Sequence, residues 1–292
     1  MKKFLLSLAL IGSMMAAYAQ KPDAEMQKAV DKALAASMDA KKGAKPATWM
    51  NLGKAYLAAY NNPTANFAQG IDRTTFSMMF KEKPAGSSSV VVDGQSFTRI
   101  KFSHVDAYFN ASDILVMWDI TRPSVPGDVL MEAAKAFHKA YELGAKEKDV
   151  APRMKEIIDY YYNDAFTAYS LGRMANASDL FKGAADVSVM TPAPERHDDA
   201  FYNTAFTALQ VKNYDRAEEY YNKCIANNHM MDGNVYASLS EIALAQADTL
   251  KAKNILATGL TSYPDNASIL TNLINLYLST KEDPAKIVEL LD

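Results

Sequence analysis

The sequence predicts a mostly helical protein built from repeated helix pairs, with a small α+β segment inserted near its start. First, a pattern of aromatic and small residues recurs in units of 34 residues. Second, apolar residues follow the 3.6-residue period of a helix over most of the chain but switch to a period of two between residues 61 and 126. Third, 292 residues with 49% hydrophobic content suffice for a row of such units.

The first nineteen residues are typical of a secretory signal peptide. Lys2 and Lys3 precede an apolar run from Phe4 to about Gly12, and Ala17-Tyr18-Ala19 offers a small-residue cleavage site. The run is too short for a permanent membrane anchor, and no later segment has 18 uncharged apolar residues. We therefore expect an exported protein that is soluble in the periplasm after cleavage near Ala19.

Charge and cysteine content exclude several classes of protein. The formal charge of −3 becomes −5 once Lys2 and Lys3 leave with the signal peptide, which is the wrong sign for a nucleic-acid surface. Cys224 is the only cysteine, so no internal disulfide can form. We expect no nucleic-acid partner, and stability that comes from packing.

Self-similarity defines the helix pairs. Residues 233–266 contain two helical patterns closed by Pro264, and the stretch TWMNLGKAY at 48–56 follows the same register. The first helix of each unit, here called helix A, repeats a bulky, then a small, then an apolar position. The second, called helix B, repeats the pattern A-x3-F-x2-A, as in Ala177, Phe181 and Ala184.

These residues resemble the tetratricopeptide (TPR) repeat, whose pattern is W-x2-L-G-x2-Y, then A-x3-F-x2-A, then Pro, in 34 residues. The resemblance implies an all-α, right-handed superhelical array of helix pairs that binds a protein or peptide partner on its concave side. The predicted segments are a signal peptide at 1–19, an N-terminal capping helix at 20–45, a first repeat split into 46–60 and 127–147 by the insertion at 61–126, a second repeat at 158–191, a third at 198–231, a fourth at 233–266 and an incomplete fifth at 267–292. The fifth unit stops two turns into helix B, which leaves two interpretations open: the sequence is a piece of a longer protein, which we favour, or the protein ends with an incomplete cap.

Two small residues receive structural roles. Gly53 costs about 1 kcal/mol in a helix interior, so we interpret it as a slot in which helix A approaches its own helix B. Ala165, Ala205 and Ser240 occupy the equivalent position in later repeats. Cys224 falls at a small apolar position of helix B, so we expect a buried, chemically inert thiol.

The insertion is expected to fold as a short helix followed by an antiparallel meander. The helix would place Phe76, Met79 and Phe80 on one side, and three or four strands would follow, with Asp93-Gly94 as a hairpin turn. In the last strand, Ile114, Val116, Trp118 and Ile120 alternate toward the side that the helix covers. This helix-then-meander order is similar to the small lipoprotein of the outer-membrane β-barrel assembly machinery.

No catalytic, metal-binding or cofactor motif is found in the sequence. It has no H-E-x-x-H, no C-x-x-C, no G-x-S-x-G and no phosphate-binding glycine run. The densest polar cluster, Glu195 to Asp199, is interpreted as a solvated loop whose carboxylates begin a helix. We therefore predict neither an enzyme nor a cofactor.

A binding surface is the remaining candidate for function. Residues at i, i+4 and i+7 of helix A lie on one stripe, which in TPR arrays lines the concave side. Aromatic and amide side chains recur there and suit an extended peptide, although the same aromatics could instead pack against a neighbouring repeat. The predicted peptide-binding residues are Tyr162, Asn163, Phe166, Tyr169, Tyr202, Asn203, Phe206 and Asn272.

The sequence therefore predicts a non-catalytic periplasmic scaffold that binds a protein or peptide. The alternative is an accessory region of an envelope enzyme or ligand carrier, with its site in the insertion or beyond residue 292. The identity of the partner, the role of the insertion and the oligomeric state stay open.

Overall fold

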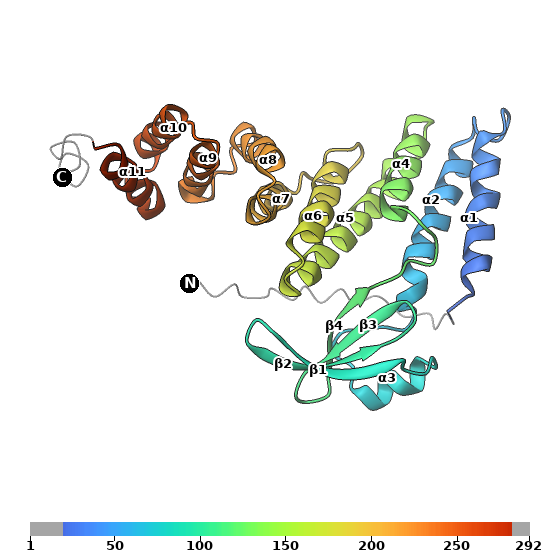
Figure 1. Cartoon of the computed structure of the whole chain (residues 1–292). Coiled ribbons are helices and arrows are strands. Elements are labelled where there is room, and N and C mark those ends of the chain that lie inside the picture. Colours follow the sequence, from blue (N-terminus) through green and yellow to red (C-terminus); the bar gives the residue numbers. More distant parts are fainter. Residues whose placement is uncertain (1–19, 282–292) are drawn as a thin grey trace. The chain divides into compact units, whose positions relative to one another are not determined.

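The computed structural model describes residues 20–281, which divide into two compact units (Figure 1). Residues 20–28 and 58–126 belong to the first unit, and residues 29–57 and 127–281 belong to the second. The signal peptide predicted at 1–19 and most of the second helix of the fifth repeat lie outside the described residues. The chain is mostly helical with one small antiparallel sheet, as the sequence predicts.

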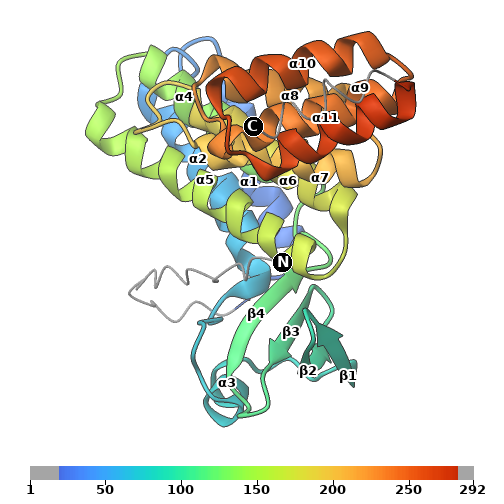
Figure 2. The ribbon, with the colours of Figure 1, turned by 90° about the vertical axis from the view of Figure 1, so that its left-hand side faces the viewer.

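The first unit contains a helix and a four-stranded sheet. Its elements are η1 (Asn62–Thr64), α3 (Arg73–Met79), β1 (Gly86–Val92), β2 (Gln95–Lys101), β3 (Val105–Phe109) and β4 (Leu115–Ile120). All neighbours are antiparallel and the order is β1-β2-β3-β4, so each strand pairs with the next along the chain (Figure 2). The turn between β1 and β2 has φ of 49° at Asp93 and 76° at Gly94, the two positive values that a tight two-residue hairpin needs.

The core of this unit is rich in phenylalanine. Phe76 of α3 and Phe80, which directly follows the helix, both pack against Phe67 from the preceding segment, and Phe76 also packs against Phe109 of β3. Rings that meet edge to face stabilise the cluster by more than the burial of their apolar area alone. Phe76 and Phe80 are buried as predicted, whereas Met79, predicted on the same side, is only half-buried.

The predicted alternation of β4 is wrong in its first half. Leu115, which is fully buried, joins the core in place of Ile114 and Val116, while Trp118 packs against the same cluster as expected. A register shift between Tyr108 and Phe109 explains the difference, because an irregular step in a ladder moves the following side chains to the other face. An alternation of apolar residues in the sequence cannot reveal such a shift in strand register.

The second unit consists of helices. They are α1 (Asp23–Met38), α2 (Pro46–Asn61), α4 (Val129–Glu142), α5 (Glu147–Ser170), α6 (Met174–Ser188), α7 (Asp198–Gln210), α8 (Tyr214–Ala226), η2 (Met231–Gly233), α9 (Asn234–Ala245), α10 (Thr249–Ser262) and α11 (Ala267–Thr280). The first residues of α1 and the last residues of α2 are assigned to the first unit. From α5 onward each helix packs against the next one along the chain (Figure 1). α9 also contacts α11, two helices further on.

The turns inside these helix pairs repeat in geometry. Gly172, Lys212 and Ala247 each have positive φ, at 73°, 58° and 62°. The amide after each of them donates to a carbonyl five residues earlier, over 2.9 Å in all three turns. This left-handed closure of helix A recurs at intervals of 40 and 35 residues, which follow the starts of the predicted repeats at 158, 198 and 233. The repeat boundaries themselves stay a prediction.

Two sequence interpretations agree with the packing. A Cβ added to Gly53 would lie 2.6 Å from the ring of Phe137 in α4, so the glycine permits a close approach between α2 and α4. Cys224 is fully buried, and burial raises the pKa of its thiol to about 12, which keeps it protonated and unreactive.

One helix is longer than predicted. α5 begins at Glu147, eleven residues before the predicted start of the second repeat at 158. The added turns bury Val150, Met154 and Ile157, although they include Pro152, which lies inside the helix and cannot donate a backbone hydrogen bond there.

Candidate functional site: an aromatic stripe on two helices

Five of the predicted peptide-binding residues form one row on α5 and α7. The row consists of Tyr162, Phe166 and Tyr169 on α5 with Tyr202 and Phe206 on α7, and we call it the aromatic stripe. All five are half-buried, whereas Tyr161 and Phe201, one position earlier in each repeat, are only 3% and 5% exposed. The structure therefore distinguishes the stripe from the core residues beside it.

The rings of the stripe touch one another within and between the two helices. Tyr162 meets Phe166 edge to face with centroids 4.9 Å apart, and Tyr202 stacks with Phe206 at 6.4 Å. Tyr169 and Phe206 connect the two helices at 6.3 Å. The ring contacts therefore form two groups, Tyr162 with Phe166 on α5 and Tyr169 with Tyr202 and Phe206 across both helices, each at spacings where aromatic pairs attract.

The inner edges of the same rings pack against the protein. Phe166 and Tyr162 both lie 5.3 Å from Phe181, a fully buried residue of helix α6. Tyr202 lies 5.8 Å from the buried Tyr221 of α8. Tyr162, Phe166 and Tyr202 therefore contribute to the core on one side and remain partly accessible on the other.

The predicted asparagines take three different positions. Asn163 is exposed beside the stripe. Asn203 donates from Nδ2 to the hydroxyl oxygen of Tyr162 over 3.1 Å, which links the two helices. Asn272, on α11, donates to the carbonyl of Ala237 and the hydroxyl of Ser240 over 3.4 Å each, so it contacts α9 rather than the stripe.

A charged loop borders one end of the stripe. The ring of His197 lies 4.1 Å from that of Tyr162, and burial lowers the pKa of this histidine. Burial and the nearby Asp199 raise the pKa of Tyr162, so its hydroxyl remains protonated. His229 and Asp199 form an ion pair at 3.0 Å when the histidine is protonated. His197, Asp199 and His229 line a cavity of about 360 Å³.

The polar cluster at 195–199 makes internal contacts. Arg196 pairs with Asp198 and donates to the carbonyl of Asn227 over 3.3 Å. Among residues 20–281, no three His, Cys, Asp or Glu side chains come together in a group that could hold a metal ion.

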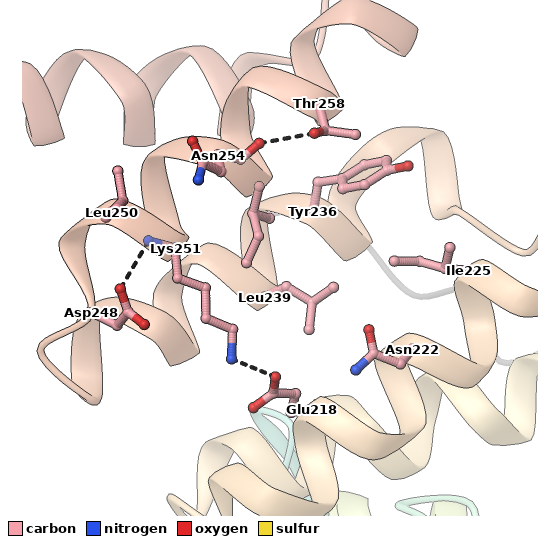
Figure 3. A pocket seen from close by; sticks show the side chains of 11 residues that line it. Glu218, Asn222, Ile225, Tyr236, Leu239, Asp248, Leu250, Lys251, Asn254 and Thr258 are labelled. Carbon is pink, nitrogen blue, oxygen red and sulfur yellow. Dashed lines mark hydrogen bonds and ion pairs between the residues drawn. The ribbon is translucent and has the colours of Figure 1, made fainter.

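Sequence reasoning missed a groove on α8, α9 and α10. It has a volume of about 550 Å³, and its walls carry Leu239, Tyr236 and Ile225 together with Leu250, which is 70% exposed (Figure 3). Lys251 of α10 reaches Glu218 of α8 across the groove, with Nζ 2.6 Å from the carboxylate (Figure 3). The apolar Leu250 between the helix-start residues Thr249 and Lys251 was the available signal in the sequence.

Within residues 20–281, no helix combines the length and apolar character needed to cross a membrane.

No protein-family model matches this chain, and no curated protein matches it. Solved structures that resemble it are TPR proteins. YrrB, described as a TPR protein with an unusual peptide-binding site, is 17% identical over 56% of this chain and 75% of its own, with a TM-score of 0.38. BtubC from P. vanneervenii is 19% identical over 56% of this chain and 76% of its own, with a TM-score of 0.40. PilF of Pseudomonas aeruginosa is 19% identical over 56% of this chain and 72% of its own, with a TM-score of 0.37. Because these scores lie below 0.5, the function proposed below depends on the residues of this chain alone.

Proposed function

We propose that this protein is an exported, non-catalytic scaffold that binds an extended segment of a protein or peptide along the aromatic stripe. The observation that carries the proposal is the half-burial of five aromatic side chains at equivalent positions of α5 and α7, next to core residues of the same helices. If these five side chains served only to pack the helices together, they would be fully buried. A row of partly accessible rings offers apolar surface to a second chain.

The chemistry of the stripe favours an extended chain with apolar side chains. Aromatic faces receive such side chains, while the exposed amide of Asn163 can pair with a peptide backbone. A site for a terminal carboxylate would require Lys or Arg, because a buried anion needs a cationic partner. The stripe contains neither.

The wider architecture enters the proposal as well. α5 to α11 would form part of a right-handed superhelix with the stripe on its concave side. α2 and α4 would be the two halves of one repeat that residues 61–126 interrupt, and the contact between Gly53 and Phe137 supports this pairing. The insertion would be a subdomain like the small lipoprotein of the β-barrel assembly machinery, serving in the envelope.

Binding is tested by selecting extended peptides from a random library against the full chain. We expect Tyr202→Ala and Phe206→Ala to weaken a selected peptide by at least about tenfold each, since aromatic anchors dominate such interfaces. Leu250→Ala, in the groove away from the stripe, is the matched control and should leave the affinity unchanged. Loss of affinity only with the control variant would place binding in the groove and refute the proposal.

Export is tested separately. Mass spectrometry of the protein from envelope fractions should find Gln20, or its cyclised form, at the N-terminus, because cleavage after Ala19 creates that end. A retained Met1 in those fractions would contradict the periplasmic assignment.

A further inference from the structure

β1 forms one outer edge of the sheet and carries no protection against further pairing. Among the described residues β1 pairs only with β2, and it lies at the end of the sheet (Figure 2). Its sequence, GSSSVVV, contains no charge and no proline, and its seven pairs with β2 run without a bulge. Natural edge strands normally carry at least one of these devices to prevent association.

Alternate residues of β1 are the accessible ones. Ser87, Ser89 and Val91 are exposed, and Val91 is 69% accessible, while Val92 is buried. In a two-residue hairpin the pair beside the turn, here Val92 and Gln95, bonds across the strands, and bonded pairs then alternate. The backbone groups of the three exposed residues therefore face away from β2.

We propose that β1 pairs antiparallel with β1 of a second copy of this chain, which joins the two sheets into one of eight strands. The strand is complementary to itself about Ser89. With Ser89 facing Ser89 of the second copy, Ser87 faces Val91 and Val91 faces Ser87, so all three outward-facing residues bond in register. A two-fold axis through Ser89 produces a closed dimer.

The charges at the two ends of the strand support this orientation. Lys83, exposed, precedes β1, and Asp93, exposed, follows it in the turn. In the proposed register Lys83 of one copy lies diagonal to Asp93 of the other, a distance that a lysine side chain can span. A parallel pairing of two β1 strands would instead put like charges side by side. The charges therefore fit a second copy in the antiparallel sense.

Disulfide trapping tests the register. In a bonded antiparallel pair the Cα atoms lie about 5.5 Å apart, within the range for a disulfide. Ser89→Cys should therefore form covalent dimers of the full chain in oxidised glutathione. Ser87→Cys is the matched control, because it lies on the same edge with similar exposure but about 14 Å from its own copy in this register. The native Cys224 is fully buried and does not compete.

We expect Ser89→Cys to cross-link at least about tenfold faster than Ser87→Cys, since disulfides do not bridge Cα atoms more than 7 Å apart. In the Ser89→Cys background, Lys83→Asp or Asp93→Lys alone should slow cross-linking, and the double exchange should restore it. Equal rates for the two cysteine variants, or no covalent dimer from either, would overturn the proposal. If an extended peptide rather than a second copy occupies the edge, neither variant will dimerise selectively. Far-UV circular dichroism of each variant verifies that the sheet and helices are retained.

Discussion

At the scale of single residues, Gly53 controls how closely α2 approaches Phe137. An alanine there would place its Cβ 2.6 Å from the ring, which is buried and cannot simply turn away. We expect Gly53→Ala to lower the free energy of unfolding by about 1 to 2 kcal/mol, because overpacking outweighs the gain of about 1 kcal/mol in helix propensity. Urea denaturation measures this change.

Ala58 provides the control for helix propensity. It lies exposed on the same helix, so Ala58→Gly should cost about 1 kcal/mol through propensity alone. If Gly53→Ala stabilises the protein, then the close contact between α2 and α4 is not present in solution, and the split repeat loses its main support.

His197 introduces a pH dependence near neutrality. Burial against Tyr162 holds its pKa in the folded protein below the ordinary value of 6.5. The unfolded chain therefore binds the proton first as the pH falls, and stability is lost on acidification below about 6.5. We expect His197→Phe, which keeps an aromatic ring beside Tyr162 but cannot be protonated, to flatten stability between about pH 7 and 5. Thermal melts across this range measure the effect, and identical slopes for both proteins would refute it.

At the scale of elements, the aromatic stripe should differ from the core beneath it. Phe181 is 1% exposed, and replacing such a side chain with alanine usually costs about 3 to 5 kcal/mol. Phe166 is half-buried against the same ring, so Phe166→Ala should cost about 1 to 2 kcal/mol. Urea denaturation of the two variants compares them. Equal costs would mean that the stripe is core packing rather than a binding surface.

The repeated helix pairs could be predicted because their pattern recurs. Ala165, Ala205 and Ser240 are all fully buried, as their shared position indicates. The first turns of α5 and the register shift in the sheet each occur once, so no periodicity reveals them. Pro152 even argues against a helix at 147, and burial of Val150 and Met154 overrides that local preference.

The candidate site was predicted in part, for a related physical reason. The aromatic stripe follows from helical spacing along single helices, and its five aromatic members do lie together. Asn272 was grouped with them by repeat position, yet it bonds to α9. The spacing of residues along a helix determines which face they share, but it does not determine which neighbouring helix accepts their hydrogen bonds. It also gives no indication of a groove lined by three helices.

At the scale of the whole molecule, the insertion should be removable. Residues 61–126 lie between two helices that we assign to one repeat, and closing a shorter loop changes the free energy by only about 0.6 kcal/mol per doubling of length. Replacing them with a short Gly/Asp turn should preserve a cooperative helical transition in circular dichroism. A broad or absent transition would show that the insertion is part of the helical core.

The proposed function requires that a partner segment lies on the aromatic stripe. Its most direct measurement is photo-cross-linking in envelope fractions, with benzoylphenylalanine replacing Phe206 in the full chain. Leu250, 70% exposed in the groove, is the matched position for the same probe. We predict a discrete cross-linked product from position 206 and none from position 250, because the probe reacts only with chains in contact with it. A product from position 250 alone would show that the partner lies in the groove and not on the stripe.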